Sequence, residues 1–275
     1  MIAVAIAGVA GRMGRAIAQA VLEESQTTLV AASTRSTDPA LGSPLCEITG
    51  GEEIGLQMVD SLHKDIEKID VVIDFTTAAS SVDHTELCHR HGKAIVIGTT
   101  GLQAQHREAI VQFSQDIPVV LSANMSVGAN VMFMLLKMAG EAIGATCDVE
   151  IIEAHHRHKV DAPSGTALQM GEIIAGTQGQ TLRQCALYGA RERSGPRPTN
   201  AIGFSSLRAG SITGEHSALF IGADERVEIG VRTENRQAYA KGAVRAAMWL
   251  KDRPAGLFDM QDVLGFKDSG NVLHK

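Results

Sequence analysis

The first half of the chain is constrained most by short apolar runs that alternate with helical patterns. The runs consist mainly of consecutive Val, Ile, Leu and Ala residues, without the polar–apolar alternation of a strand that has one solvent-facing side. We therefore expect strands buried on both faces, as in a Rossmann-type, doubly wound parallel α/β sheet. The expected strands are residues 2–7, 29–32, 71–75, 94–97 and 119–121, and the expected helices are residues 12–24, 82–91 and 102–114.

The second half changes character after an apolar helical stretch at residues 127–143. Several strand patterns separated by Gly-containing turns predict an open antiparallel or mixed sheet, and therefore a smaller α+β domain. The expected strands are residues 148–154, 202–208, 211–215, 217–221 and 226–232, with helices from residue 166 and at 236–250, and a short ending at 257–264.

Two stretches lack an apolar period and are predicted to be loops. Residues 36–56 carry several glycines and two prolines, which indicate a loop or an irregular excursion. Residues 178–198 are rich in Gly, Arg and Pro, which predicts a mobile surface loop.

The bulk composition excludes several classes of protein. A net charge of −6 argues against broad binding of nucleic acid or of an anionic membrane, because both require a basic surface. The longest apolar stretch is interrupted by Asn130, Lys137 and Glu141, so we expect no membrane span. The four cysteines are far apart and form no CxxC pair, which is typical of reduced thiols in the cytoplasm.

A glycine-rich turn follows the first expected strand and opens the first helix. Gly8, Gly11 and Gly14 are spaced G-x-x-G-x-x-G, whereas the usual dinucleotide-binding turn has glycine where this chain has Ala10. Such glycines let a pyrophosphate approach free N–H groups at the positive end of a helix. A tight connection without a ligand would use the same residues. The strand before the turn and the helix after it favour cofactor binding.

The end of the second expected strand distinguishes between cofactors. An NAD site usually places Asp or Glu there to accept hydrogen bonds from the ribose. This chain has Ser33, Thr34, Arg35 and Ser36 instead. Arg35 and the hydroxyls would bind a 2′-phosphate that a carboxylate would repel, with Arg12 assisting. The sequence therefore predicts NADPH, with the alternative that Arg35 is only a solvated loop charge.

Two further turns follow strands at the same expected sheet edge, at residues 74–77 and 98–101. Ligands of open α/β sheets bind outside the carboxyl ends of the strands. We therefore expect these turns beside the nicotinamide and its ribose, although each could instead serve only as a helix cap.

A dense cationic cluster follows the expected strand at residues 148–154. His155, His156, Arg157, His158 and Lys159 are consecutive, and histidine is well suited to protonate a reacting atom near neutral pH. HHxH can also supply zinc ligands, and a carboxylate lies two residues earlier. The arginine and lysine argue against a metal, because fixed cations repel a dication.

A helix-start signal lies just beyond this cluster. Pro163 stiffens the entry, and Ser164 or Thr166 can cap the helix. The backbone N–H groups of Gly165 and Thr166, at the helix start, would face a bound carboxylate. Any helix can begin this way without a ligand, but the adjacent cations favour an anionic substrate.

Together these motifs carry a resemblance that spans nearly the whole chain. The chain resembles the 4-hydroxy-tetrahydrodipicolinate reductase (dihydrodipicolinate reductase) family of lysine and diaminopimelate biosynthesis. The stretch from the histidines to SGTA is the most specific part of this resemblance. The matching segments are GVAGRMGR at 8–15, DFT at 74–76, GKAIVIGTTG at 92–101, ANMSVGAN at 123–130, IIEAHHRHKVDAPSGTAL at 151–168, IGFSSLRAG with GEH at 202–216, and GLFDM at 256–260.

The resemblance implies a role for each residue of the cationic cluster and the helix start. His155 is the implied proton donor, Lys159 a second catalytic cation, and His156 a substrate contact. Ser164, Gly165 and Thr166 are implied to hold a substrate carboxylate. Arg236 is the best positional match to an arginine associated with the ligand in relatives.

The resemblance also implies cofactor contacts and departs from the family at two of them. Met125 stands where many members carry an aromatic residue, and Thr34 stands where many carry the ribose-binding acid. The second departure favours NADPH, with NADH possible but weakened. The implied pyrophosphate contacts are Gly8, Gly11, Arg12 and Met13, and the implied nicotinamide-side contacts are Phe75, Gly98, Thr99, Thr100, Ala123, Asn124 and Met125.

The resemblance further implies an arrangement of domains and an assembly. Residues 1–126 and 237–275 would form the NADP(H)-binding domain, with the last long helix returning to it. Residues 127–236 would bind the substrate and mediate association, through their sheet, into a homotetramer. The two domains are expected to close on each other. The reaction would be hydride transfer from NADPH to a cyclic imine with two carboxylates, and His155 would supply the proton.

Three other functions remain open at this point. Another two-domain NADP-linked dehydrogenase is one, although an aspartate-semialdehyde type needs a cysteine nucleophile that no cysteine motif here provides. A regulator that binds NADPH without turnover is another, but it would not need histidines that can donate a proton to a substrate. A metal hydrolase at the histidines is the third.

Overall fold

The computed structural model describes residues 1–50, 53–189 and 195–267. The chain divides into two compact units, which are described separately. Unit 1 contains Met1–Val127 and Arg236–Lys275, and unit 2 contains Gly128–Asn235. None of the helices in the described residues is long and apolar enough to cross a membrane.

Unit 1 is built on a six-stranded sheet with the order β11-β5-β4-β3-β1-β2. Every pair of neighbouring strands is parallel, which confirms the doubly wound α/β domain. The elements are β1 (Ile2–Ala7), α1 (Arg12–Glu23), β2 (Thr27–Ser33), α2 (Cys46–Thr49), the 3₁₀ helix η1 (Ile66–Lys68), β3 (Val71–Asp74), α3 (Ala78–Arg90), β4 (Ala94–Ile97), α4 (Ala104–Phe113), β5 (Pro118–Leu121), α8 (Gln237–Leu250), β11 (Gly256–Phe258) and α9 (Met260–Val263).

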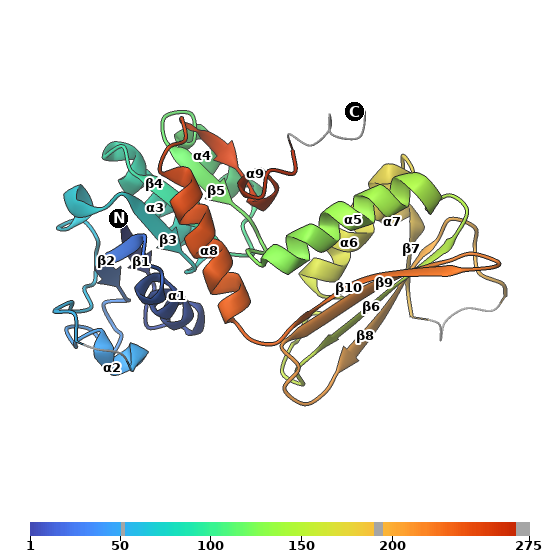
Figure 1. The fold of residues 1–275 in the computed structure, drawn as a ribbon, viewed down its shortest axis with the longest axis horizontal. Helices are drawn as coiled ribbons and strands as arrows, with labels where there is room; N and C mark the ends of the chain where they lie inside the picture. The colour runs from blue at the N-terminus through green and yellow to red at the C-terminus, as the bar shows by residue number, and fades with distance from the viewer. Residues whose placement is uncertain (51–52, 190–194, 268–275) are drawn as a thin grey trace. The chain divides into compact units, whose positions relative to one another are not determined.

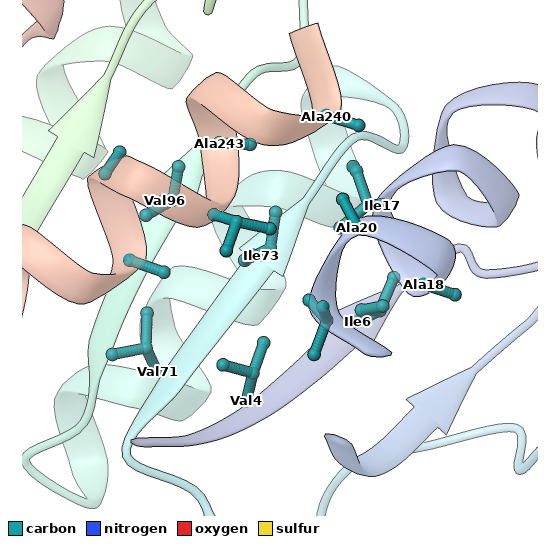
Figure 2. Close-up of a cluster of buried hydrophobic side chains, with 14 of the residues drawn as sticks. Val4, Ile6, Ile17, Ala18, Ala20, Val71, Ile73, Val96, Ala240 and Ala243 are labelled. Carbon is teal, nitrogen blue, oxygen red and sulfur yellow. The ribbon is translucent and has the colours of Figure 1, made fainter. Parts of the chain in front are cut away.

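Helices cover both faces of this sheet, which explains the uninterrupted apolar runs in its strands. On one face, side chains of β1, β3 and β4 point toward α1 and α8, as Figure 2 shows for Ile6 and Ile73 against Ile17 and Ala243. On the other face, strand residues such as Val72 and Ile95 pack with residues of α3 and α4. Burial on both faces removes the polar positions that a solvent-facing side would need.

Unit 2 contains a five-stranded sheet with the order β10-β9-β6-β8-β7. β6 pairs in parallel with β8 and antiparallel with β9, which confirms the expected mixed sheet. Helices α5 and α6 cover one face of it (Figure 1). The elements are α5 (Val127–Ile143), β6 (Asp148–His155), α6 (Gly165–Thr177), α7 (Leu182–Cys185), β7 (Ala186–Tyr188), β8 (Ile202–Arg208), β9 (Gly214–Ile221) and β10 (Arg226–Thr233).

The structure corrects two expectations in unit 2. The predicted loop at residues 178–198 contains the short helix α7 and the strand β7, where Tyr188 packs on Phe204 at a ring-centroid distance of 5.3 Å. Residues 190–194 of that prediction lie outside the described residues. The two strands expected at 211–215 and 217–221 are one strand, because alternate residues, including His216, Ala218 and Phe220, are buried without a break.

Candidate active site

Strand β6 ends in two buried polar side chains. Val149 and Ile151 face the core beneath α5 and α6, and the period of two along a strand places Glu153 and His155 on the same face. Glu153 is only 1% exposed and His155 is 8% exposed. A run that starts as hydrophobic core therefore ends in a buried carboxylate and a buried imidazole.

The carboxylate of Glu153 is surrounded by hydrogen-bond donors. Its Oε2 lies 2.6 Å from Nδ1 of His155, and Arg208 donates to both oxygens, at 2.8 and 2.6 Å. The backbone N–H of Ser164 also donates to Oε1 at 3.3 Å. Burial alone would raise the pKa of Glu153, but the hydrogen bonds from Arg208, Ser206 and His155 lower it to about 2. Glu153 is therefore ionised throughout the physiological range.

A second histidine, His216 of β9, lies against the first. The rings of His155 and His216 meet edge to face, with centroids 5.0 Å apart, and Nε2 of His216 lies 3.0 Å from Oγ of Ser164. Burial, together with the charge of His155, lowers the pKa of His216 to about 4. Burial also lowers the pKa of His155, although Glu153 opposes this effect. His216 is therefore uncharged at neutral pH.

The turn after β6 carries the other cations of the cluster. Nζ of Lys159 lies 2.9 Å from Oδ1 of Asp161, and the positive charge of Lys159 lowers the pKa values of both His155 and His216. Arg208 also donates to the carbonyl oxygen of Asp161 at 2.7 Å. Arg208 thus connects β8, the end of β6 and the turn.

The start of α6 adjoins this turn. Ser164 is buried and caps the helix, because its Oγ accepts a hydrogen bond from the backbone N–H of Ala167 at 3.2 Å. Gly165 is exposed, and a Cβ added there would meet no atom within 4 Å. The first turn of α6 is therefore open to an anion. In the part of the chain that the structure describes, no group of three or more His, Cys, Asp or Glu side chains is arranged to hold a metal ion.

The predicted substrate residues fall into two groups. His155, Lys159 and the residues of the helix start come together in unit 2, with His156 half-buried in the turn beside them. Arg236 belongs to unit 1, where it precedes α8. Sequence reasoning gave no role to Arg208 or His216, although both lie in segments that carry the family resemblance.

A separate cavity of about 370 Å³ lies in unit 1 at the carboxyl ends of the strands. Gly8 needs to be glycine here, because its φ is +76° and an added Cβ would lie 2.7 Å from Cγ2 of Thr76. Gly11 precedes α1 and has no side chain to cap it, which leaves the first N–H groups of the helix for an anion. These features fit a dinucleotide pyrophosphate. The lining residues are Gly8, Ala10, Gly11, Ser33, Thr34, Arg35, Asp38, Asp60, Phe75, Thr76, Thr77, Ser80 and His84.

The cavity includes some of the predicted cofactor residues and not others. Gly8, Gly11, Thr34, Arg35 and Phe75 line it. The predicted residues outside its lining are Arg12, Met13, Gly98, Thr99, Thr100, Ala123, Asn124 and Met125.

Local packing accounts for three of the residues outside the cavity. A Cβ on Gly98 would lie 2.1 Å from the Phe75 ring, so the glycine lets that ring lie against the backbone. Thr99 is buried, and its Oγ1 accepts a hydrogen bond from the backbone N–H of Thr76 at 3.0 Å. Met125 is 1% exposed in the core.

The cavity also holds carboxylates that sequence reasoning missed. Asp38 and Asp60 line it together with Arg35, and Arg35 Nη2 lies 3.7 Å from Asp38 Oδ2. A hydrogen bond from the backbone of Ala40 lowers the pKa of Asp38, and Thr34 and Arg35 add to the effect. The usual position for a ribose-binding acid is the end of β2, whereas Asp38 follows a short turn after β2 and reaches the cavity from there.

Comparisons with known proteins identify the family. One family model, described as "Dihydrodipicolinate reductase, N-terminus", matches residues 2–125, and another, "Dihydrodipicolinate reductase, C-terminus", matches residues 128–264. The chain belongs to the dihydrodipicolinate reductase family. Members of this family are NAD(P)H-dependent oxidoreductases that reduce dihydrodipicolinate in lysine biosynthesis, and this chain has the same activity. The alternative functions left open by the sequence are not favoured.

Solved structures agree with this assignment. A dipicolinate-bound dihydrodipicolinate reductase from Paenisporosarcina sp. TG-14 is 25% identical, with a TM-score of 0.76, and the match covers 95% of this chain and 98% of that one. An amine dehydrogenase from Mycobacterium smegmatis is 11% identical, with a TM-score of 0.66 and coverage of 93% and 94%. A probable dehydrogenase from Thermotoga maritima is 13% identical, with a TM-score of 0.65 and coverage of 95% and 92%. The last two share the fold alone.

Proposed function

We propose that unit 2 binds a cyclic dicarboxylate and protonates it during reduction, with His155 as the acid. The relative from Paenisporosarcina binds dipicolinate, a ring with two carboxylates, which supports a dianionic substrate. Unit 1 would bind NADP(H), and the reduced nicotinamide supplies the hydride.

The residues of unit 2 would divide the work on the substrate. The N–H groups of Gly165 and Thr166, with the Ser164 cap, bind one carboxylate at the positive end of α6. Lys159 and His156 neutralise negative charge on the ring. His155 holds a proton at the imidazole and gives it to the reduced substrate, and Lys159 supports this step as a second catalytic cation.

The observation that carries this proposal is the buried His155, which lies between an ionised carboxylate and a group of cations beside an open helix start. Its test is the variant His155→Gln. Loss of a general acid should lower kcat by about 10²- to 10⁴-fold and change KM much less. His89→Gln, in which a half-buried histidine of α3 paired with Asp116 is replaced, serves as the matched control. An unchanged kcat in His155→Gln would remove His155 from the mechanism.

We also propose that NADPH is preferred over NADH. Arg35 lines the cavity beside the Thr34 hydroxyl and would bind the 2′-phosphate, while Gly8, Gly11, Arg12 and Met13 hold the pyrophosphate. The proposed nicotinamide-side contacts are Phe75, Gly98, Thr99, Thr100, Ala123, Asn124 and Met125. Arg236 is proposed as a further substrate contact.

The variant Arg35→Ala tests the cofactor preference. Loss of a charged phosphate contact should raise KM for NADPH by about tenfold to a hundredfold and leave KM for NADH nearly unchanged. Arg107→Ala, in which an exposed arginine of α4 outside the cavity is replaced, is the control. Equal losses for both cofactors in Arg35→Ala would contradict a role in phosphate binding.

We propose further that four copies associate through the sheet of unit 2. Ile152, Leu207 and Ile221 alternate with the core-facing residues of their strands and therefore lie on the sheet face away from α5 and α6, where they are 42%, 51% and 40% exposed. An apolar face of this kind is typical of an interface. Ile152→Glu should dissociate a tetramer in analytical ultracentrifugation, whereas Leu22→Glu on α1 should not. A wild-type monomer would refute the proposal.

The proposed location is the cytoplasm. All four cysteines are free in the structure, which suits a reducing compartment. Cell fractionation with an antibody to the chain tests this placement.

A further inference from the structure

One buried carboxylate connects the proposed acid with the proposed anion site. Glu153 Oε2 lies 2.6 Å from His155 Nδ1, while Glu153 Oε1 accepts from the backbone N–H of Ser164, which caps α6. Arg208 donates to both oxygens. The Glu153 carboxylate, held by Arg208, therefore fixes the positions of both the imidazole and the helix start.

The geometry also assigns different tasks to the two ring nitrogens of His155. An ionised carboxylate can only accept hydrogen bonds, so Nδ1 carries a hydrogen toward Glu153, and Nε2 is the nitrogen that exchanges a proton. A Cβ added to Gly214 would lie 3.2 Å from Nε2. Glycine at this position therefore keeps the space beside Nε2 free.

We propose that Glu153, held by Arg208, is a positioning residue that orients His155 and fixes its Nδ1 proton for transfer from Nε2. This inference deepens the proposed function and rests on it. Glu153 does not touch the substrate in this scheme. It acts through His155, in the way that a carboxylate partner fixes the tautomer of a catalytic histidine.

A competing interpretation makes Glu153 and Arg208 only a structural ion pair. Both interpretations expect a loss of stability when the pair is broken, since removing one partner leaves a buried charge. They differ in what happens to His155. The charge of Glu153, 2.6 Å away, changes the proton affinity of the imidazole in either case. A positioning residue also changes the rate of proton transfer, whereas a structural pair leaves that rate unchanged.

The decisive variant is Glu153→Gln, studied in the full-length protein. The charges facing His155 are Glu153 on β6, Lys159 on the turn and Arg208 on β8, with His216 on β9 as a further titratable group. Glu153 raises the pKa of His155 and the two cations lower it, so removal of the Glu153 charge should lower it further. NMR titration of the imidazole measures this shift without substrate. We expect kcat to fall about tenfold or more, with less than about a twofold change in KM.

Glu150→Gln is the matched control. Glu150 lies on the same strand, with its side chain on the opposite face, where Arg197 donates to it at 2.8 Å. This variant makes the same change of charge next to an arginine and should leave the pKa of His155 unchanged. If Glu153→Gln does not fold, Glu153→Asp can replace it. Aspartate keeps the negative charge but is one methylene shorter, so its carboxylate lies farther from Nδ1 of His155, and kcat should still fall.

The outcomes separate this inference from the proposed function. Combining Glu153→Gln with His155→Gln should lower kcat no further than His155→Gln alone, because the two residues act as one unit. If His155→Gln leaves kcat unchanged, the proposed function fails. If His155→Gln lowers kcat but Glu153→Gln leaves kcat unchanged, the positioning role alone is overturned, whether or not the pKa of His155 shifts.

Discussion

Nζ of Lys159 lies 2.9 Å from Oδ1 of Asp161, two residues further along the same turn. The proposed substrate cation is therefore already paired with a carboxylate of its own chain. A partly exposed ion pair of this kind contributes only about 0–1 kcal/mol. A substrate carboxylate can therefore displace Asp161 at little cost.

The first prediction concerns this pair. Asp161→Asn should lower the KM for the dicarboxylate substrate by about two- to fivefold, because Lys159 no longer has an internal competitor. Steady-state kinetics with varied substrate measure the change. Asp224→Asn, at an exposed position between β9 and β10, should leave KM as it is. A raised KM in Asp161→Asn would show instead that Asp161 holds Lys159 in place for binding.

The second prediction concerns the turn after β1. Gly8→Ala should lower the free energy of unfolding by about 1–2 kcal/mol from backbone strain, with a further loss from the contact with Thr76. It should also weaken NADPH binding in isothermal titration. Gly92→Ala, with a φ of +63° and open space around it, separates strain from contact. Equal effects of the two variants would mean that the Thr76 contact is unimportant.

The third prediction concerns the carboxylate beside Arg35. Asp38→Asn removes a negative charge 3.7 Å from Arg35 in the cavity and should favour the anionic 2′-phosphate. We expect the ratio of KM values for NADPH and NADH to fall about three- to fivefold. Asp65→Asn, which alters a carboxylate paired with Lys68 outside the cavity, should not change this ratio. A ratio that rises would show that Asp38 orients Arg35 rather than competing with the phosphate.

The fourth prediction concerns pH and His216. Its pKa in the folded protein, about 4, is below the usual value of 6.5, so the unfolded chain binds the proton more tightly. Stability should therefore fall as the pH drops from 6.5 to about 4, by up to about 3 kcal/mol from this residue. Glu153, whose pKa is lowered from 4.5 to about 2, adds a separate loss below pH 4.5.

Urea unfolding of wild type and His216→Gln across this range tests the fourth prediction. The variant should lose stability less steeply between pH 6.5 and about 4 than the wild type does. His63→Gln, at an exposed position, should follow the wild type. Parallel curves for wild type and His216→Gln would mean that His216 is not the titrating group.

The parts of the fold predicted well are those that depend on local pattern. The runs that form β1, β3 and β4 are apolar, apart from Asp74 at the end of β3, because helices cover both sheet faces. For residues 257–264 the sequence predicts only a short ending and no strand. β11 has three residues, with a partly exposed Leu257, and it becomes a strand only through pairing with β5. That pairing joins residues far apart in the sequence, which no local pattern reveals.

The same division applies to the candidate site. Residues from His155 to Thr166 could be proposed from sequence because they are nearly contiguous. Arg208 and His216 could not be predicted in this way, because the register of the sheet brings them to the site. Arg208 on β8 is paired with His155 on β6, and His216 on β9 is paired with Glu153 on β6. A register is set by the whole sheet, and its consequences appear only when neighbouring strands are known.

The imidazole sits on a strand, whereas the ammonium group of Lys159 sits on a turn of irregular backbone. Strand pairing on both sides makes the first a rigid platform, while turns tolerate insertion and replacement. Protein engineers could therefore diversify the exposed turn residues Arg157, His158 and Val160 to accept other acidic rings and keep His155 and Lys159 in place.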